Sequence, residues 1–340
     1  MKQINWGIIG CGNVTEVKSG PAFNKISGSN LVAVMRRNGA KARDYAERHG
    51  VPKWYDDAQQ LISDPEVNAV YIATPPDSHA HYTQMAAQAG KPVYVEKPMA
   101  LSFAECQDMI VACEQARVPL FVAYYRRRLP TFLKVKELID AGAIGACRLV
   151  SVELWRPLGL DEQDAADLPW RVQPAIAGGG HFVDLATHQL DFLDYMFGPI
   201  TMAKGTASNQ SGLYPAEDTV CASLQFESGV IGSGIWCFST APNEKRDLIR
   251  IIGTRGRLSF STFDHTVPIT LETGQKNETF TPPTPQHIQQ PLIETICQAL
   301  QGSGHCPSTG KSAARTTRVV DQILADWRDG LEIQSTAHIK

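Results

Sequence analysis

The sequence lacks the features that would assign it to a membrane, secreted or nucleic-acid-binding class. No apolar run reaches the length of a membrane span, and residues 1–3 lead directly into the apolar segment 4–9 with no signal-peptide pattern. The formal net charge of −3 gives no reason to expect nucleic acid or an anionic membrane as a partner. The eight cysteines include no CxxC pair, which is typical neither of a zinc site nor of a disulfide framework. We therefore expect a cytoplasmic protein with reduced thiols.

The first part of the chain has the pattern of a parallel sheet covered by helices. A length of 340 residues suits two domains better than one core. In residues 1–122 short apolar runs alternate with helix-like segments, which indicates strands buried on both faces. We predict an α/β, doubly wound NAD(P)-binding domain of the Rossmann type over residues 1–122. The expected strands are residues 4–9, 31–35, 69–73, 93–95 and 120–123, and the expected helices are residues 40–49, 57–62, 78–89 and 102–116.

The pattern changes in the second part, residues 123–340. Several longer apolar segments between residues 201 and 270 are separated by short turn signals, so a mostly antiparallel sheet is expected. We predict an α+β domain with a large, open sheet that serves substrate binding and oligomerisation. Its other expected elements are helices at 131–141, 181–196, 287–300 and 313–327 and a strand at 147–155.

A glycine-rich turn follows the first expected strand. Gly10 and Gly12 are followed by Asn13 and Val14, where a helix is expected to begin. A dinucleotide pyrophosphate needs backbone N–H groups close to it and a helix N-terminus behind them. Glycines often only end strands, and Thr15 stands where a third glycine or alanine is preferred. The position at the first strand-to-helix turn nevertheless favours dinucleotide binding by these four residues.

Two arginines follow the second expected strand. An acidic residue at this point would bind both ribose hydroxyls of NAD, but Arg36 and Arg37 stand here instead. The planar guanidinium group suits a 2′-phosphate, and a hydrogen bond to a charged group contributes roughly 1.5–3 kcal/mol. The alternative is that both arginines are solvated loop residues. We predict NADP as the cofactor, with NAD less favoured.

Two further segments carry candidate catalytic residues. Lys97 follows the expected strand 93–95, and ligands of open α/β sheets bind beyond the carboxyl ends of the strands. Asp184 and His188 are four residues apart, so they share one face of the expected helix, and three glycines precede them. By itself, this spacing is also that of an ordinary surface pair.

The same spacing could suggest a metal site. His181 and Asp191 lie nearby, but no third ligand arrives at a convincing spacing, and Lys97 would repel a cation. We therefore predict no metal.

Together these segments resemble the glucose–fructose oxidoreductase / inositol dehydrogenase (Gfo/Idh/MocA) family over essentially the whole chain. The resemblance implies a Rossmann domain, a mostly antiparallel substrate domain, a site between them, and homodimers or homotetramers formed through the second-domain sheet. Thr15, Arg36 and Tyr125 depart from the family pattern. The matching residues are Gly10-Cys11-Gly12, Ala73-Thr74-Pro75 with His79, Glu96-Lys97-Pro98, Tyr124-Tyr125-Arg126-Arg127 with Pro130, and Gly179-Gly180 with Asp184 and His188.

Other site residues are expected on the basis of this resemblance and of their positions. Thr74 and Pro75 end a strand and are expected to line the cofactor site. His79, Glu96 and Lys97 complete the family motifs near the cofactor. Trp170 and Arg171 resemble a segment that reaches the cofactor or substrate, although aromatic residues also fill cores. The residues expected to contact substrate are Tyr125, Trp155 and Gly180.

The residue types indicate a hydride-transfer reaction. Removing hydride from an alcohol carbon requires removal of the hydroxyl proton, and histidine can exchange that proton near neutral pH. We expect His188 as general acid/base, Asp184 to orient the substrate or the imidazole, and Lys97 to stabilise the oxyanion or share the proton transfer.

We predict an NADP(H)-dependent oxidoreductase that acts on CH–OH groups of a sugar, cyclitol or related diol. Two alternatives remain open at this point: an NAD(P)-using glycoside hydrolase of related fold, and a non-catalytic NADP sensor.

Overall fold

The computed structural model describes residues 1–162, 164 and 166–337. The chain forms two compact units, Met1–Leu129 with Thr284–Ala314 and Pro130–Pro283 with Arg315–Lys340. This division differs from the predicted ranges 1–122 and 123–340, because residues 284–314 return to the first unit. Ser308 Oγ donates to the Val122 carbonyl at 2.7 Å, a long-range contact that local patterns cannot reveal. Within the described residues no helix has both the length and the apolar character needed to span a bilayer.

The first unit contains the predicted parallel sheet. All pairings are parallel and the strand order is β3-β2-β1-β4-β5-β6, the order of a dinucleotide-binding Rossmann sheet. The short edge strand β3 was not predicted, since its three residues are all at least partly exposed. The strands are β1 (Ile4–Ile9), β2 (Ser29–Met35), β3 (Lys53–Tyr55), β4 (Ala69–Ile72), β5 (Val93–Val95) and β6 (Leu120–Val122).

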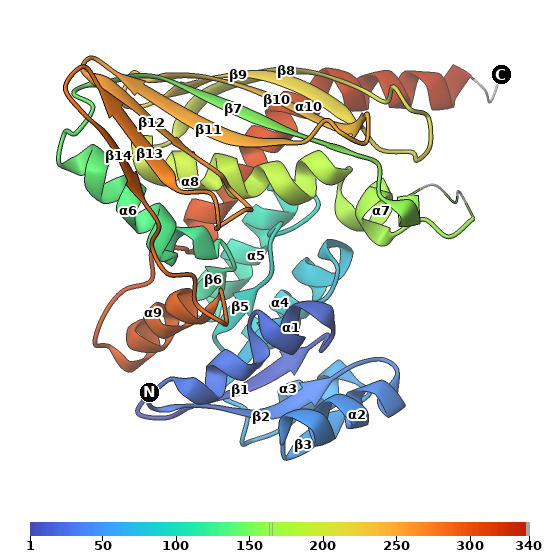
Figure 1. Cartoon of the computed structure of the whole chain (residues 1–340). Coiled ribbons are helices and arrows are strands. Elements are labelled where there is room, and N and C mark those ends of the chain that lie inside the picture. The colour runs from blue at the N-terminus through green and yellow to red at the C-terminus, as the bar shows by residue number, and fades with distance from the viewer. Residues whose placement is uncertain (163, 165, 338–340) are drawn as a thin grey trace. The chain divides into compact units, whose positions relative to one another are not determined.

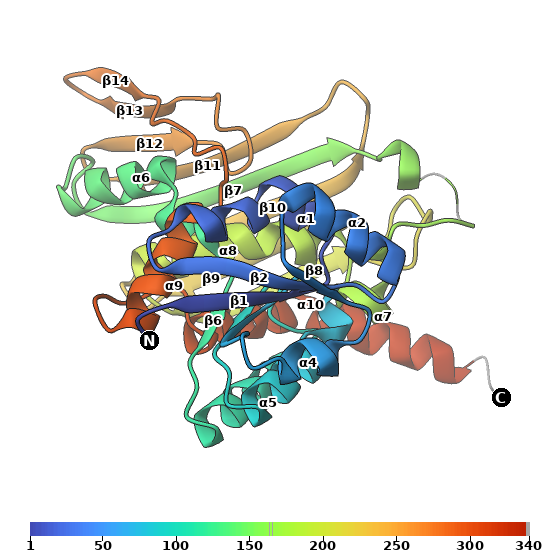
Figure 2. The same ribbon diagram turned by 90° about the horizontal axis from the view of Figure 1, so that it is seen from below.

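Helices cover both faces of this sheet, as Figure 2 shows with α1 and α2 on one side and α4 and α5 on the other. Helix starts follow local capping chemistry: Asn38 accepts from Lys41 N–H, and Ser102 accepts from Glu105 N–H. Gly50, at φ +65°, ends α2. The helices are α1 (Asn13–Val17), α2 (Gly39–His49), α3 (Ala58–Ser63), α4 (His79–Gln88), α5 (Phe103–Gln115) and α9 (Gln290–Gln301), with a 3₁₀ turn η1 at Gly20–Lys25.

The second unit contains an eight-stranded sheet of order β14-β13-β12-β11-β7-β10-β9-β8. All its pairs are antiparallel except β7 with β10, so the predicted, mostly antiparallel sheet is confirmed. The strands are β7 (Cys147–Pro157), β8 (Ile200–Ser208), β9 (Thr219–Phe226), β10 (Ile231–Thr240), β11 (Arg246–Gly253), β12 (Gly256–Phe260), β13 (Ile269–Thr273) and β14 (Asn277–Phe280).

Helices cover one face of the large sheet (Figure 1). Phe132 packs edge-on against Phe192 at 4.8 Å, and Phe182 packs against Trp236 at 5.0 Å. Along the strands buried residues alternate with exposed ones, so the other face is open. The helices are α6 (Pro130–Asp140), α7 (Pro174–Ala177), a π-helical turn at Phe182–Ala186, α8 (Thr187–Phe197) and α10 (Gly310–Ala337).

Candidate active site

The glycine turn after β1 is shaped by two glycines with different roles. Gly10 has φ +91°, and a Cβ there would lie 2.6 Å from the Thr74 side chain, so the fold itself requires glycine. At Gly12 a Cβ would lie 3.8 Å from the Gly10 carbonyl oxygen, an ordinary contact distance. The fold therefore does not require glycine at this position, which leaves open space of the kind that a pyrophosphate needs.

The hydrogen bonds of Thr15 show why a threonine stands where the glycine pattern prefers a third glycine or alanine. Its buried hydroxyl donates to the Gly12 carbonyl at 2.8 Å, and Gly12 N–H donates back to that hydroxyl at 2.9 Å. These two bonds close the turn, while Asn13 is exposed and Val14 partly exposed at the start of α1. The predicted cofactor-binding residues thus form one accessible turn.

Arg36 lies beside this turn. Burial raises the pKa of the Cys11 thiol to about 11, and the positive charge of Arg36 acts in the opposite direction. Arg36 is partly exposed and Arg37 exposed. No described carboxylate forms an ion pair with either guanidinium. The first guanidinium is therefore near the glycine turn with its charge uncompensated.

His79 lies at the start of α4, within the expected helix. Thr74 and Pro75 are partly exposed at the end of β4, but His79 is fully buried. Its Nδ1 lies 3.0 Å from the Pro98 carbonyl and its Nε2 lies 2.8 Å from the Thr74 carbonyl. Burial lowers the pKa of His79, and the carbonyl contacts act against that shift. His79 thus joins the strand end to the segment after Lys97, and its contact with the cofactor stays a prediction.

Glu96 and Lys97 directly follow β5. The Lys97–Pro98 peptide is cis, and Lys97 is partly exposed. Glu96 is buried, and its carboxylate accepts from Tyr71 Oη and Gln289 Nε2, both at 2.6 Å, and from Lys97 N–H at 3.2 Å. The carboxylate of Glu96 thus faces the interior of the first unit, and its contact with the cofactor stays a prediction. The same carboxylate holds the backbone of Lys97.

Gln289 is a member of this network that sequence reasoning missed. It donates to Glu96 and also accepts from Tyr94 Oη at 2.7 Å. Tyr94 stacks on Tyr71 at 4.7 Å. Since Gln289 is 193 residues from Glu96, no local pattern could have placed it here.

In the second unit, Asp184 lies in the π-helical turn and His188 lies in the first turn of α8. Their predicted common face assumed α-helical geometry, which residues 182–186 do not have. Short π-helical turns are rare overall, and those that occur are frequently found at functional sites. Arg171 Nε lies 3.4 Å from the Asp184 carboxylate and its guanidinium stacks 4.4 Å above the Trp170 ring. The structure thus brings Trp170, Arg171 and Asp184 together.

His188 is 4% exposed, and its ring lies 5.9 Å from that of Phe263. The neighbouring Gln189 accepts from Trp236 Nε1 at 2.7 Å and donates to Thr262 at 2.9 Å, which fixes this turn of α8 on the sheet. Asp247 accepts from Phe263 N–H at 2.7 Å and so fixes the aromatic neighbour. The imidazole is therefore held by packing on a rigid element.

Glu217 lies behind the glycines that precede Asp184, and sequence reasoning missed it. It accepts from Gly180 N–H at 2.8 Å, and a Cβ on Gly180 would lie 2.6 Å from the Glu217 carbonyl oxygen. Burial raises the pKa of Glu217 to about 7, opposed by its backbone hydrogen bonds and by Arg328. Buried Gly180 is thus enclosed by Glu217.

The remaining predicted substrate residues occupy ordinary positions within their own units. Tyr125 is 6% exposed, with the Arg126 guanidinium 5.1 Å from its ring centre. Trp155 is partly exposed near the carboxyl end of β7. Neither position tests a substrate contact.

Among the described residues no group of three histidine, cysteine or acidic side chains is arranged to hold a metal ion. His181 lies 2.6 Å from Glu162, and Asp191 lies 3.4 Å from Thr316. Both residues that could have extended a metal site are therefore engaged within the second unit.

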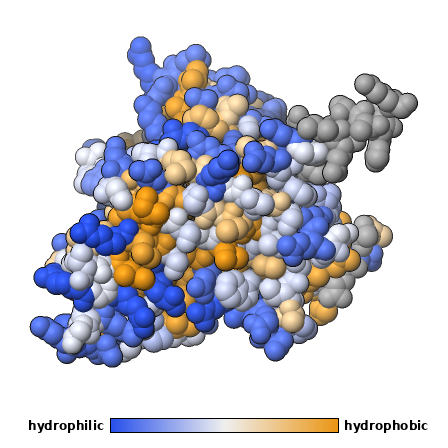
Figure 3. All heavy atoms as spheres, turned by 90° about the horizontal axis from the view of Figure 1, so that it is seen from above, coloured by the Kyte–Doolittle hydropathy of each residue, from blue (hydrophilic) through white to orange (hydrophobic). Residues whose placement is uncertain are grey.

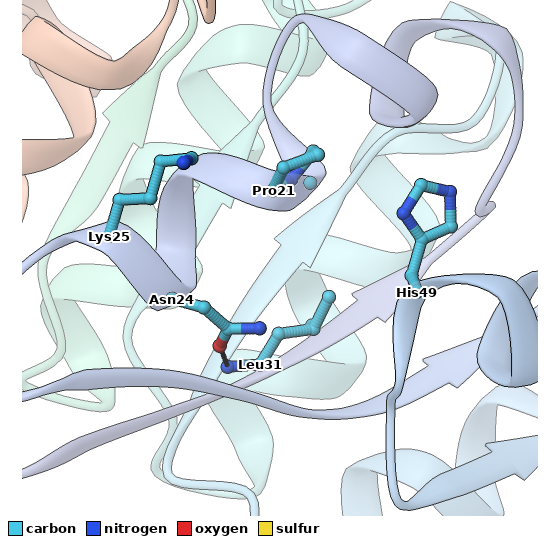
Figure 4. A pocket seen from close by; sticks show the side chains of 6 residues that line it. Pro21, Asn24, Lys25, Leu31 and His49 are labelled. Carbon is cyan, nitrogen blue, oxygen red and sulfur yellow. Dashed lines mark hydrogen bonds between the residues drawn. The ribbon is translucent and has the colours of Figure 1, made fainter.

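A pocket of about 300 Å³ lies against η1 and β2 (Figure 4). Asn24 accepts from Leu31 N–H at 2.7 Å, and His49 lies 2.7 Å from Glu16, so these polar groups already serve the fold. No predicted site residue borders this pocket, and we do not include it in the candidate site. Its lining residues are Gly20, Pro21, Asn24, Lys25, Leu31 and His49.

Comparison with known proteins identifies the family. Residues 4–124 match the oxidoreductase family with an NAD-binding Rossmann fold, and residues 132–259 match the GFO/IDH/MocA C-terminal domain. Oxidoreductase P35 of Formosa agariphila is 40% identical over 94% of this chain and 98% of its own length. The chain belongs to the Gfo/Idh/MocA family. It is an oxidoreductase with a nicotinamide-nucleotide-binding fold, as predicted.

Two further relatives show the range of the family. The 1,5-anhydro-D-fructose reductase of Ensifer adhaerens is 27% identical, with 90% of this chain and 91% of the relative covered. The crystal structure of the aldose-aldose oxidoreductase of Caulobacter crescentus with glycerol superposes with a TM-score of 0.84 at 26% identity, covering 96% of this chain and 98% of that one. Both names describe reactions at carbon bearing oxygen.

Proposed function

We propose that this protein transfers hydride between NADP(H) and a carbon bearing oxygen on a sugar, cyclitol or related diol. The observation that carries the proposal is the position of Lys97, directly after β5 at the carboxyl edge of the sheet. There its N–H is held by buried Glu96. Ligands of such sheets bind at this edge. The names of the relatives support a sugar-like substrate.

The cofactor fits the first unit in two respects. Gly12 leaves space at the turn after β1, and Arg36 places an uncompensated guanidinium beside it. When bound, the nicotinamide ring supplies or accepts the hydride. Structural neighbours were solved with NADH or with NADP. We infer the preference for NADP from Arg36 and Arg37, because a guanidinium group matches a 2′-phosphate.

Parallel kinetics with NADPH and NADH test this preference. We expect Arg36→Ala to reduce the preference for NADPH about tenfold, the value of one charged hydrogen bond. Arg43→Ala is a matched control, since Arg43 is exposed on α2 and already paired with Glu47 at 2.7 Å. Equal efficiency of both cofactors with the unaltered enzyme would reject the phosphate role.

The chain supplies proton transfer and charge stabilisation. In our proposal, the His188 imidazole takes the hydroxyl proton during oxidation and returns it during reduction. The Lys97 ammonium stabilises the negative charge that develops on the same oxygen. Asp184, oriented by Arg171, accepts a hydrogen bond from the substrate or from the imidazole.

Lys97→Ala tests the catalytic proposal. We expect kcat to fall about 10³-fold, the scale of losing one oxyanion donor, while the Kd for NADPH changes little. The readouts are NADPH absorbance for turnover and calorimetry for cofactor binding. Lys91→Ala is the matched control, because Lys91 lies on the same segment and donates to the Asp64 carbonyl at 2.8 Å. Full activity of Lys97→Ala would show that the assignment is wrong.

We also propose that copies of the chain assemble through the open face of the large sheet. Figure 3 shows hydrophobic side chains gathered on this side of the molecule. Leu149, Met202, Ile231 and Ile235 are each 43–51% exposed on its strands. Ile231→Glu should convert the assembly to monomers in analytical ultracentrifugation, because a carboxylate would be buried at the contact.

A cytoplasmic location remains part of the proposal. All eight cysteines are free thiols, and Cys221 is exposed. Exposed free thiols are typical of a reducing compartment. Localisation of the tagged protein in fractionated cells would test this.

A further inference from the structure

A buried ionic cluster lies at the carboxyl end of β7. Arg156 Nη2 donates to Glu162 Oε1 at 3.0 Å, and the same carboxylate oxygen lies 2.6 Å from His181 Nε2. Glu162 Oε2 accepts from Gly159 N–H at 2.9 Å. The Glu162 and His181 side chains are 3% and 5% exposed. Since His181 precedes Asp184 by three residues, this cluster adjoins the candidate catalytic segment.

Glu162 carries the negative charge of this cluster. Burial alone would raise the pKa of Glu162, but the bonds from His181 and Gly159 and the charge of Arg156 outweigh it and lower that pKa. Arg156 Nη2 also lies 3.0 Å from Nε2 and 3.2 Å from Nδ1 of the His181 ring. The guanidinium of Arg156 is thus paired with the carboxylate of Glu162, and the His181 imidazole lies against both.

Arg156 has one bound side and one accessible side. Its side chain is 37% exposed although both partners are buried. Its hydrogen bonds are all made through Nη2, and within the described residues Nη1 has no partner and is not fully enclosed. A guanidinium fixed in this way offers preorganised N–H donors, because little rotational freedom remains to be lost on binding.

The surrounding charges favour an uncharged ligand. Glu162 compensates Arg156, and Asp184 compensates Arg171. Asp218 adds negative charge near Tyr214, whose ring packs edge-on against His181 at 6.1 Å. A substrate carboxylate would lose its hydration here without gaining an uncompensated cation in this unit. Hydroxyl groups can use the N–H donors without that penalty.

We propose that Arg156 binds hydroxyl groups of the substrate, and that Glu162, by balancing its charge, makes the enzyme select uncharged sugars or polyols over the corresponding sugar acids. This inference rests on the proposed function, since it places substrate beside Asp184 and His188.

Initial rates on matched pairs test the selectivity. The pairs are D-glucose with D-glucuronate and D-galactose with D-galacturonate, each with NADP⁺ and the full-length enzyme. We expect kcat/KM of the neutral member to be at least about tenfold higher. Glu162→Gln leaves Arg156 uncompensated and should shift the ratio about tenfold toward the acid, mainly through the KM of the acid.

Two variants make the test specific. Arg156→Gln should raise the KM for the neutral sugar about tenfold with kcat nearly unchanged. It also serves if Glu162→Gln fails to fold. Glu272→Gln is the matched control, because Glu272 pairs with Arg257 at 2.6 Å on another strand pair of the same sheet. It should leave the ratio of neutral to acid unchanged.

Binding separates this inference from the proposed function. Calorimetric titration of the NADPH-loaded enzyme with the same sugars reports the preference even if none is turned over. Turnover of the acids in preference to the neutral sugars would overturn the inference and leave the oxidoreductase function standing. If neither Glu162→Gln nor Arg156→Gln changes the ratio of neutral sugar to acid, the inference is overturned and the oxidoreductase function still stands. Neutral-sugar binding without turnover would count against the proposed reaction alone.

Discussion

Glu96 in the first unit and Glu217 in the second are both buried, and each accepts a hydrogen bond from the backbone beside a proposed catalytic residue. They differ in how their charge is supported. Glu96 accepts from a tyrosine, a glutamine and a backbone N–H, whereas Glu217 accepts from backbone N–H groups alone.

This difference in donors matters for Glu217, whose carboxylate is supported by backbone N–H groups alone. Burial disfavours the charged form, and each hydrogen bond to that form works against burial. For Glu217 burial prevails and its pKa rises to about 7. The segment before Asp184 is therefore held by a group that changes charge near neutral pH.

The largest expected effect is that of Glu96→Ala. This change removes the carboxylate that accepts hydrogen bonds from three donors. Two of these donors, Tyr71 Oη and Gln289 Nε2, are side-chain groups that lose a buried acceptor. We expect the free energy of unfolding to fall by about 4 kcal/mol, with a parallel loss of kcat. Urea denaturation and steady-state kinetics measure both. A decrease of less than about 1 kcal/mol in the free energy of unfolding would show that the hydrogen bonds to Glu96 contribute little to stability.

Glu217→Gln should alter the pH dependence of stability. The folded pKa of about 7 lies above the ordinary value of 4.5, so the folded state holds the proton more tightly than the unfolded chain. In the wild type, the stabilising contribution of Glu217 is fully present below pH 4.5 and is lost as the pH rises through 7. Between pH 5 and 8 we expect the variant to gain about 3 kcal/mol relative to wild type. Urea unfolding at both pH values measures this, and parallel curves would refute it.

Gly180→Ala should have the next largest effect on stability. Its Cβ would lie 2.6 Å from the Glu217 carbonyl oxygen, which is backbone and cannot rotate away. We expect a loss of about 2 kcal/mol in urea denaturation and a lower kcat, because the segment before Asp184 must move. Gly274→Ala is the control, since a Cβ there meets nothing within 4 Å. Equal stability of the two variants would argue against this tight fit.

Tyr71→Phe should have the smallest effect. It removes one of the three donors to Glu96 and keeps the ring that stacks on Tyr94. We expect a loss of about 1.5 kcal/mol, with Lys97 still positioned by the other donors and kcat nearly unchanged. A loss as large as that of Glu96→Ala would mean that the donors act as one unit instead of separately.

Local patterns predicted five of the six strands of the parallel sheet and the mostly antiparallel character of the other sheet. Periodic apolar runs and capping residues such as Ser102 depend on neighbours within a few residues, so they can be read from the chain. The three-residue strand β3 and the π-helical turn at Phe182–Ala186 were missed, because their conformation depends on tertiary contacts. His79 and Glu96 were identified as motif residues, but their hydrogen-bond partners could not be read from the sequence.

The amino-acid sequence alone determined the family pattern, the parallel and antiparallel sheets, and the candidates Lys97, Asp184 and His188. Only the tertiary structure showed which residues from distant parts of the chain surround these candidates. Gln289 donates to Glu96 across 193 residues, and Glu162 balances Arg156 next to His181. Burial and hydrogen-bond partners set the charge of such groups, and both come from segments that meet only in the folded chain.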